Sequence, residues 1–391
     1  IRDDLVTGVQ TCALPILFSL DIANMPNRKT EESNTEISIK GPRDGFVEHL
    51  PTNIALVRKR LRTTSLCCET FLIGEKSETK IALLYVEDSI RPETINEARE
   101  RIQKVNVKAL MGSGPLEEIL ANRTYSLFPE MTYTGRPDFV VDCLVRGRFA
   151  IIADGSPMAL IAPVNLTLLL KSPEDSYNNF YVVSAEMVMR MVGLWISIFL
   201  PGFWVALSSY NMEQLPFPLL ATLVMSRLGL PLPGPVEAIM MLGLFELFRE
   251  AGLRLPKAVG QTIAVVGGII IGDAVIRAGL ASTLMVIFSA VTAVATFTLV
   301  NQTLSGAVTI IRFLILLASA LLGMFGYILA TIALVLYFAN MKSFGVPYLS
   351  PITPIKPKDL VAALLRKPWE RKVIPLRFLQ GDDGNAQGGE S

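Results

Sequence analysis

Two long stretches without a charged side chain constrain the fold of this chain more than any other feature. Ala278–Ile311 runs for 34 residues, and Phe313–Met341 for 29 residues, without Asp, Glu, Lys or Arg. About 20 apolar residues are enough to cross the roughly 30 Å hydrocarbon core of a bilayer. The first stretch can therefore hold one membrane helix plus a connection and the second another, so the C-terminal half is predicted to lie in a membrane.

The composition indicates a chain whose halves face different solvents. Charged residues make up 18% of the sequence, below the roughly 25% of soluble domains, and they concentrate in the first 180 residues and in the tail. The net charge is only +1, and no basic stripe interleaved with aromatic residues is present, which argues against nucleic-acid binding. Cys67, Cys68 and Cys143 lack metal-ligand spacing, as expected of a domain in a reducing compartment.

The N-terminal residues are set apart from the rest. Val6–Ile16 matches one translated frame of a common sequencing-library adapter, so residues 1–16 are expected to be an assembly artefact. Residues 17–40 are rich in Asn, Thr, Glu and Lys, which predicts a flexible segment.

Two α/β subdomains are predicted next, over residues 41–110 and 111–179. The first is expected to contain two helices and a strand pair, at Pro51–Thr64, Cys67–Ile73, Lys80–Val86 and Arg91–Lys104. The second is expected to contain a helix at Pro115–Ala121 and a hairpin within Gly147–Pro163. The turn of that hairpin is predicted at Asp154-Gly155-Ser156-Pro157, since these residue types favour tight turns.

A multi-pass α-helical membrane domain is predicted over residues 180–341. Its spans are expected at about 191–212, 259–276, 281–300 and 314–338. Trp195 and Trp204 are candidates to anchor the first span at the headgroups. The connection 215–251 is apolar but punctuated by prolines and acidic residues, so it is predicted to lie on the membrane surface or to re-enter the membrane.

The tail predicts the orientation. Lys342–Arg377 carries eight basic residues against Asp359 and Glu370, which marks the cytoplasmic side. Residues 342–391 are therefore expected to form a basic cytoplasmic tail. With an even number of spans, the N-terminal α/β domain is also cytoplasmic.

Several motifs resemble one known family. Glu246–Thr262 (ELFREAGLRLPKAVGQT), Lys342–Pro351 (KSFGVPYLSP) and Lys367-Pro368-Trp369 are similar to segments of the GerA spore germination family. Gly41–Glu48 (GPRDGFVE) and Gly147–Pro163 (GRFAIIADGSPMALIAP) resemble its N-terminal domain. The motifs occur in the family's order from about Gly41 to Trp369.

The resemblance implies an A subunit of a nutrient germinant receptor in the inner membrane of a bacterial spore. The expected partners are a transporter-like B subunit and a lipoprotein C subunit, and the expected activity is an oligomeric channel that releases monovalent cations. SpoVAF-type members of the family imply an alternative, a similar channel that amplifies the germination signal. A further alternative is a non-conducting membrane scaffold that relays a signal.

The second predicted span carries the candidate pore. Helical spacing places Thr262, Val266, Ile269 and Asp273 on one face, which is predicted to line an ion path. Gly268 and Gly272 have the Gly-x-x-x-Gly spacing that lets helices pack closely. A closed gate is expected to be hydrophobic, at Val265, Val266 or Ile269, because narrow apolar constrictions dewet.

The charged residues of the membrane domain have competing interpretations. A charge at mid-bilayer costs at least about 2.5–3.5 kcal/mol, so Asp273 must face water or a partner, unless it pairs with Arg277 four residues on. Glu237 and Glu246 either form a ring that attracts cations or are solvated interfacial carboxylates. Arg249 lies in the same segment, and Arg312 is expected to snorkel from the start of the last span.

An enzyme is not expected. His49 is the only histidine, so His-based acid–base catalysis or a histidine metal site would depend on one residue. No metal site or cofactor is predicted. A secondary transporter is disfavoured because no paired broken helices in inverted repeats are evident.

Overall fold

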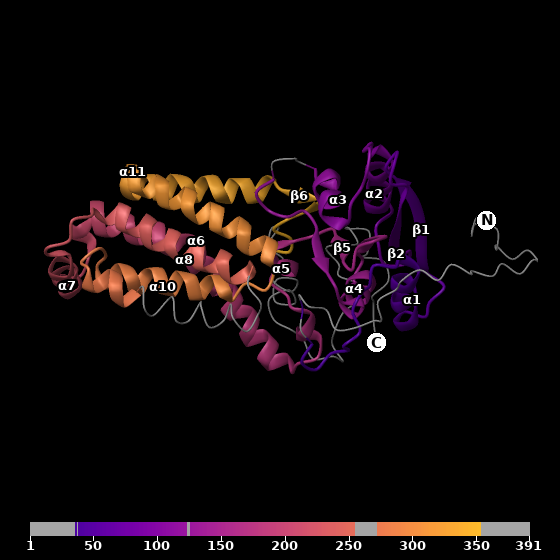
Figure 1. Ribbon diagram of the computed structural model, residues 1–391, viewed down its shortest axis with the longest axis horizontal. Helices are drawn as coiled ribbons and strands as arrows, with labels where there is room; N and C mark the ends of the chain where they lie inside the picture. The colour runs from indigo at the N-terminus through magenta and orange to yellow at the C-terminus, as the bar shows by residue number, and fades with distance from the viewer. Residues whose placement is uncertain (1–35, 37, 123–125, 255–271, 353–391) are drawn as a thin grey trace, which may run out of the picture.

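The computed structural model describes residues 36, 38–122, 126–254 and 272–352, which form an α/β domain joined to a helical part (Figure 1). The helical part extends to one side of the sheet as a bundle of long helices (Figure 1). Its end beside the sheet is called the proximal end, and the opposite end, near Tyr210 and Gly323, the distal end.

The α/β domain contains one sheet of five strands in the order β1-β2-β4-β5-β3, with every pairing antiparallel. The strands are β1 (Leu66–Ile73), β2 (Thr79–Val86), β3 (Thr132–Thr134), β4 (Phe149–Ala153) and β5 (Ala159–Ala162). The hairpin predicted around Asp154 is confirmed, because β4 pairs directly with β5. The two predicted subdomains share this sheet, since β2 from the first pairs with β4 from the second.

Helices cover both faces of the sheet. They are α1 (Leu50–Arg60), α2 (Pro92–Lys104), α3 (Ser113–Leu120), α4 (Pro137–Val145) and α5 (Leu166–Leu169). Alternate residues of β2 enter different cores: Leu84 packs with residues of α1 and α4, whereas Leu83 packs with residues of α2 and α3. Side chains of a strand alternate between faces, so burial on both faces explains the continuous apolar runs in β2, β4 and β5.

The helical part is built from long helices. The 3₁₀ helix η2 (Pro173–Ser176) leads into α6 (Phe180–Tyr210), which is followed by η3 (Met212–Gln214), α7 (Phe217–Arg227), α8 (Gly234–Arg254), α10 (Thr283–Phe297) and α11 (Gln302–Asn340). The predicted first and third spans correspond to α6 and α10. The predicted second span, 259–276, falls mostly outside the described residues.

The fourth predicted span, taken as one helix over 314–338, is wrong: α11 folds back on itself. A straight helix of its 39 residues would be about 58 Å long, yet both of its ends contact the α/β domain, through Asn301 and Tyr337. The reversal is at Gly323, whose φ of 63° is left-handed. The two halves lie antiparallel, one above the other (Figure 1).

Gly326 shows how closely the two halves of α11 approach. A Cβ built on Gly326 would overlap the carbonyl group of Ala318, eight residues earlier in sequence. Such a contact is impossible along one continuous helix, in which eight residues span about 12 Å. The described part of the chain therefore makes five helical passes along the bundle: α6, α8, α10 and the two halves of α11.

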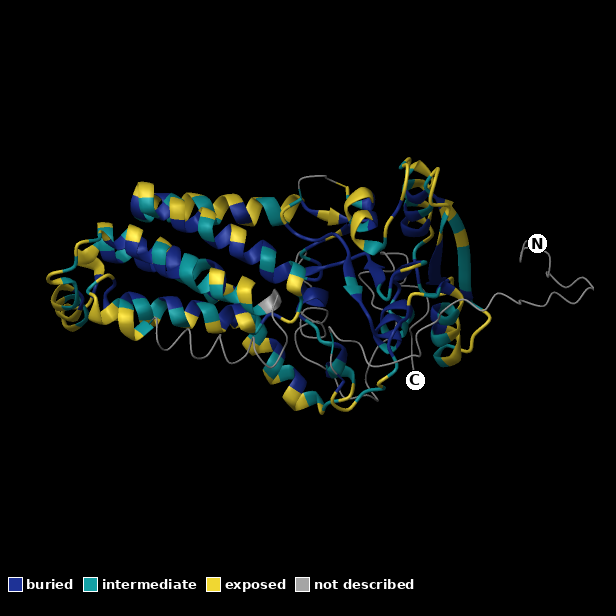
Figure 2. Cartoon of the chain, viewed as in Figure 1, coloured by how far each residue is buried: buried dark blue, intermediate teal, exposed yellow. Residues whose placement is uncertain are grey.

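Many residues on the outer faces of the long helices are exposed (Figure 2), and large apolar side chains are frequent among them. On α10, Ile287, Val291, Val294 and Phe297 are exposed. Within the described residues, α6 and α11 are long and apolar enough to cross a membrane by length and composition, and each half of α11 is close to the ~20 residues that one crossing needs. Exposed apolar surface of this extent is expected to face lipid or protein.

The residues after α11 return to the α/β domain. The short strands β6 (Lys342–Ser343) and β7 (Val346–Pro347) form a hairpin, and Phe344 and Tyr348 are fully buried. The first part of the predicted basic tail is thus integrated into the domain. Residues 353–391 lie outside the described residues.

Candidate functional site

A cluster of charged side chains lies inside the helical part, between α8, α10 and α11. Arg312 of α11 has only 3% of its side chain exposed; its Nη2 donates to Glu246 Oε2 of α8 at 3.1 Å and its Nη1 to Thr296 Oγ1 of α10 at 2.9 Å. Arg249 Nε donates to the other oxygen of the Glu246 carboxylate at 2.9 Å. The prediction that Arg312 snorkels to the interface is wrong, because its guanidinium is enclosed by these partners.

Hydroxyl groups complete this cluster. Arg249 Nη1 donates to Ser305 Oγ at 2.7 Å, and Thr309 accepts from both arginines at 3.4 Å. Two guanidinium groups and one carboxylate give the cluster a formal charge of +1. Ionisable groups at such positions are costly and often functional, so this cluster is a candidate functional site.

A second polar junction lies at the distal end. Glu237, in the first turn of α8, is 1% exposed and accepts hydrogen bonds from the backbone N and the hydroxyl of Ser282, the N-cap residue of α10. A carboxylate at a helix N-terminus satisfies free N–H groups and complements the helix dipole. Because Glu237 is buried, it is not the solvated interfacial carboxylate that was one of its two predicted interpretations.

The candidate pore segment is only partly described. Thr262, Val265, Val266, Gly268 and Ile269 lie outside the described residues. Gly272 and Asp273 are described: a Cβ on Gly272 would meet nothing within 4 Å, and Asp273 is an exposed residue that pairs with Arg277 at 2.7 Å. The intrahelical pair is therefore the arrangement of Asp273 seen within this chain.

Tryptophan positions also differ from expectation. Trp195 is exposed, and its place at a headgroup layer stays a prediction, whereas Trp204 is buried and stacks on Phe288 of α10 at 3.8 Å between ring centroids. Trp204 is thus a packing residue between α6 and α10 and not an interfacial anchor.

The α/β domain contacts the helical part at several points. Asn301, which caps α11 by accepting from Leu304 N at 3.0 Å, also donates to Thr132 Oγ1 of β3 at 2.8 Å. At the other end of α11, the Tyr337 hydroxyl accepts from Leu127 N at 3.0 Å. One hydrophobic core also runs from α4 and the sheet into α6 and α11. The domain therefore contacts both ends of the α11 hairpin.

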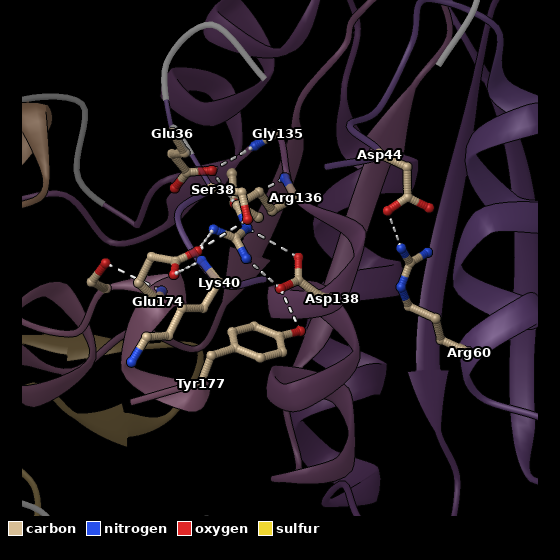
Figure 3. A network of polar contacts seen from close by, with 12 residues as sticks. Glu36, Ser38, Lys40, Asp44, Arg60, Gly135, Arg136, Asp138, Glu174 and Tyr177 are labelled. Carbon is tan, nitrogen blue, oxygen red and sulfur yellow. Dashed lines mark hydrogen bonds and ion pairs between the residues drawn. The ribbon is translucent and has the colours of Figure 1, made fainter. Parts of the chain in front are cut away.

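A buried arginine connects the domain to η2, the short helix that precedes α6 (Figure 3). Arg136 pairs with Asp138 at 2.7 Å and with Glu174 of η2 at 2.5 Å, and Glu174 in turn accepts from Lys40 N and Ser38 Oγ. Burial acts against the charge of Arg136, but the hydrogen bonds to Asp138 and Glu174 outweigh it and raise the pKa of Arg136. Sequence patterns did not single out this network, whose members are far apart in the chain.

A small cavity of about 50 Å³ lies where the domain meets the helical part. Its lining comes from the segment before α1, from β3, α4 and α5, from the linker before α6, and from the α10–α11 connection with the start of α11: Glu36, Thr132, Tyr133, Phe139, Leu168, Lys171, Pro173, Val300, Asn301 and Gln302. Burial, with Arg146 and Arg148 nearby, lowers the pKa of Lys171 to about 7. Among the described residues, no group of three or more His, Cys, Asp or Glu side chains is arranged to hold a metal ion.

The α/β domain shares a core with long helices whose outer surface is apolar and which enclose paired charges. This arrangement is consistent with a membrane-associated protein that carries an attached domain. Residues 6–374 match the family model described as the Bacillus/Clostridium GerA spore germination protein. The chain belongs to this GerA family, so the resemblance inferred from its motifs is confirmed.

Named relatives agree with this assignment. The chain is 46% identical over 355 residues to Spore germination protein XA of Bacillus anthracis, covering 90% of this chain and 72% of that protein. It is 37% identical to Spore germination protein KA of Bacillus subtilis (strain 168), covering 88% of this chain and 63% of that protein. The chain thus spans about two thirds of the length of these relatives.

One solved structure is similar in sequence. It is the N-terminal domain of the A subunit of the Bacillus megaterium spore germinant receptor GerK3, at 33% identity, covering 30% of this chain and 94% of that chain, with a TM-score of 0.25.

Proposed function

We propose that this chain acts in spore germination as the A subunit of a germinant receptor, and that it forms an oligomeric, ligand-gated channel for monovalent cations. Its partners would be a transporter-like B subunit and a lipoprotein C subunit, and its place the inner membrane of the spore. Family membership supports the role in germination, and the solved relative is named as the A subunit of such a receptor.

The observation that carries the conducting role is the buried charge in the helical part. Arg312, with 3% of its side chain exposed, lies among apolar helices at a large desolvation cost and pairs with the partly exposed Glu246, and intramembrane ionisable groups commonly mark ion pathways or their gates. Their partners come from three helices, so a change in helix packing would break the cluster. The cluster is therefore suited to gating. The ion path itself is proposed to run along the predicted face of the second span, which carries Thr262, Val266, Ile269 and Asp273.

The orientation proposed for the chain is multi-pass with both flanking regions in the cytoplasm, on the core side of the spore. The segment after α11 packs into the α/β domain, since Asn165 Nδ2 donates to Ser350 O at 2.8 Å and Val164 N donates to Ser343 Oγ at 3.0 Å. The two regions therefore lie on one side of the helical part. The basic residues of the tail favour the cytoplasmic side.

A non-conducting scaffold is the second candidate, favoured by the contacts of the α/β domain with the ends of α11. A signal received by the domain would pass through Asn301 and Tyr337 to the helices and on to another subunit. A third, related candidate is a SpoVAF-like amplifying channel, which differs in its trigger and not in its conduction.

Planar-bilayer conductance of the full chain, purified with B and C partners and exposed to germinant, tests the proposal. We expect cation-selective current that changes with Asp273→Asn and with Val266→Ala. The matched controls are Asp88→Asn, an exposed carboxylate of the α/β domain, and Val294→Ala, an exposed valine of α10. Current unchanged by both test variants would move the pore elsewhere, and no current in a preparation that binds germinant would favour the scaffold.

A further inference from the structure

The side chain of Lys171 lines the cavity between the α/β domain and the helical part. The residue lies in the linker between α5 and η2 and is partly exposed. Its amine forms no hydrogen bond with any of the described residues. A lysine amine that is desolvated and lies near other cations is more often neutral, and the neutral amine is the nucleophilic form. Lys171 is therefore a candidate for covalent chemistry.

The charges around Lys171 come mainly from the end of α4 and the turn after it, and they are mostly positive. Arg146 and Arg148 oppose the ammonium form of Lys171, and Asp142 and Cys143 favour it less strongly. The Asp142 carboxylate is already paired with Arg146 at 2.7 Å. Together with burial, these charges lower the pKa of Lys171 to about 7. The same positive charges would stabilise a negative group at this position.

Arg148 also has an unused hydrogen-bond donor. It is buried, and it donates from Nε to Pro163 O at 3.2 Å and from Nη2 to Asn165 Oδ1 at 3.3 Å. Its Nη1 is buried and has no hydrogen-bond partner among the described residues. A buried donor without an acceptor is unfavourable and needs an explanation. An anionic group close to Arg148 would offset this cost.

The cavity has room for a small group attached to the Lys171 amine. A volume of about 10–15 Å³ is enough for one water molecule, so about 50 Å³ accommodates a group of roughly three heavy atoms. Hydroxyl and amide donors suited to an anion line the cavity, on Thr132, Tyr133 and Gln302. Glu36 lines it too, but burial raises the pKa of its carboxyl, which weakens its repulsion of an anion.

We propose that Lys171 is a carbamylation site, at which the neutral amine reacts reversibly with carbon dioxide. The amine nitrogen forms a bond to the carbon of carbon dioxide, and one C=O electron pair moves onto oxygen. The nitrogen then loses a proton to solvent, so the product is a carbamate and nothing is oxidised or reduced. The side chain becomes negative and is stabilised by the charges of Arg146 and Arg148. The site does not depend on whether the chain conducts ions.

The modification changes the contact between the domain and the helices. Lys171 belongs to the linker that leads to α6, and the cavity also borders Asn301, which donates to Thr132 Oγ1 of β3 at 2.8 Å. A carbamate replaces an unpaired cation at this junction with an acceptor for the donors around it. Carbon dioxide should therefore tighten the junction and slow hydrogen exchange in β3.

Chemical trapping on the full chain in nanodiscs tests the proposal. The protein is equilibrated with ¹³C-labelled bicarbonate in mildly alkaline buffer, treated with triethyloxonium, which converts carbamates into stable ethyl esters, and analysed by peptide mass spectrometry. We expect the label on Lys171 at about tenfold or more the occupancy of Lys59 and Lys76, because these exposed amines are almost fully protonated. Occupancy of Lys171 no greater than that of Lys59 and Lys76 would overturn the proposal.

Two variants separate the chemistry from general effects of bicarbonate. Lys171→Arg keeps a positive charge but has no reactive amine, so bicarbonate should slow hydrogen exchange in β3 of the native chain and not of this variant. Equal slowing in both would overturn the role of Lys171. Arg146→Gln should lower the occupancy of Lys171 by about threefold or more, because it removes a nearby cation. Arg62→Gln, at an exposed arginine after α1, is the matched control. Equal occupancy in the two glutamine variants, both shown to be folded by circular dichroism, would contradict stabilisation by the arginines.

Discussion

Arg312 and Glu246, 66 residues apart in the sequence, are joined by a hydrogen bond of 3.1 Å that fixes α11 against α8. The pair lies in the apolar helical part, so neither charge can be removed alone without leaving the other in an unfavourable environment. The same carboxylate also holds Arg249, so α8 and α11 share one charge network.

Glu246→Gln should destabilise the helical part. It leaves two guanidinium groups without their carboxylate, and breaking a buried ion pair by removing one partner costs about 3–5 kcal/mol. Because Glu246 is 24% exposed, we expect a smaller loss, about 1–3 kcal/mol, in the free energy of unfolding measured in mild detergent.

The exposed carboxylate of Glu213, on η3, provides the control for that change, and Glu213→Gln should alter stability by less than about 0.5 kcal/mol. Adding Arg312→Gln to Glu246→Gln should cost less than the sum of the two single changes. Strict additivity of the two would contradict a direct interaction between the side chains.

Gly323→Ala should weaken the reversal of α11. The residue has a φ of 63°, which side chains with a Cβ rarely adopt, and the added Cβ would lie 2.8 Å from the Tyr210 ring. We expect a loss of about 1–3 kcal/mol in the free energy of unfolding. Gly306→Ala, within the first half of α11 and facing open space, should be neutral or stabilising by up to ~1 kcal/mol; equal effects of the two would contradict a turn at Gly323.

The secondary structure of the α/β domain was predictable because its signals are local. Turn residues separate β-branched and aromatic runs, and β1, β2 and the β4–β5 hairpin lie within a few residues of their predicted positions. The joining of both halves in one sheet was not predictable, since strand order depends on long-range pairing of β2 with β4. The burial of Phe344 and Tyr348 in the domain was not predictable either, because it also depends on contacts between residues far apart in the sequence.

The reversal at Gly323 has almost no sequence signal. The residues around it are apolar, with exposed Leu321, Leu322 and Phe325 at the tip, where a soluble hairpin would have polar turn residues. Only Gly323 and Gly326 mark it, and glycine is common in membrane helices. A continuous uncharged run therefore predicted one helix where the fold contains two.

Only part of the charge cluster was predicted from the sequence. Glu246 and Arg249 were singled out as membrane-associated charges, but Arg312 separates two uncharged stretches and lies at the boundary predicted for a span. A boundary arginine is expected to reach the interface. Its actual partners lie on α8 and α10, and no spacing rule connects residues on different helices.

Asn301 should act both as a helix cap and as a contact to the domain, and two substitutions separate these roles. Asn301→Asp keeps the acceptor that caps α11 but removes the donor to Thr132, so we expect stability to change by less than about 1 kcal/mol, with faster hydrogen exchange in β3. Asn301→Ala removes both and should cost about 1–2 kcal/mol. Unchanged exchange in β3 for both variants would show that the Thr132 contact does not hold the domain to the helices.

Lys171 should make the stability of the protein depend on pH. Burial and the neighbouring arginines lower its pKa from 10.5 to about 7 in the folded protein, so between pH 7 and 10.5 the unfolded chain binds more protons than the folded one. Burying the charged form of Lys171 destabilises the fold. This destabilisation is fully present below pH 7 and decreases as the pH rises from 7 to 10.5.

We expect the melting temperature to rise from pH 7 to pH 9, and Lys171→Met to raise stability at pH 7 and flatten the rise. Because Lys171 lies in the linker before α6 and lines the cavity against Asn301, the same variant also tests whether its charge loosens the contact between the domain and the helices. A pH profile identical in the native chain and in Lys171→Met would place the titrating group elsewhere.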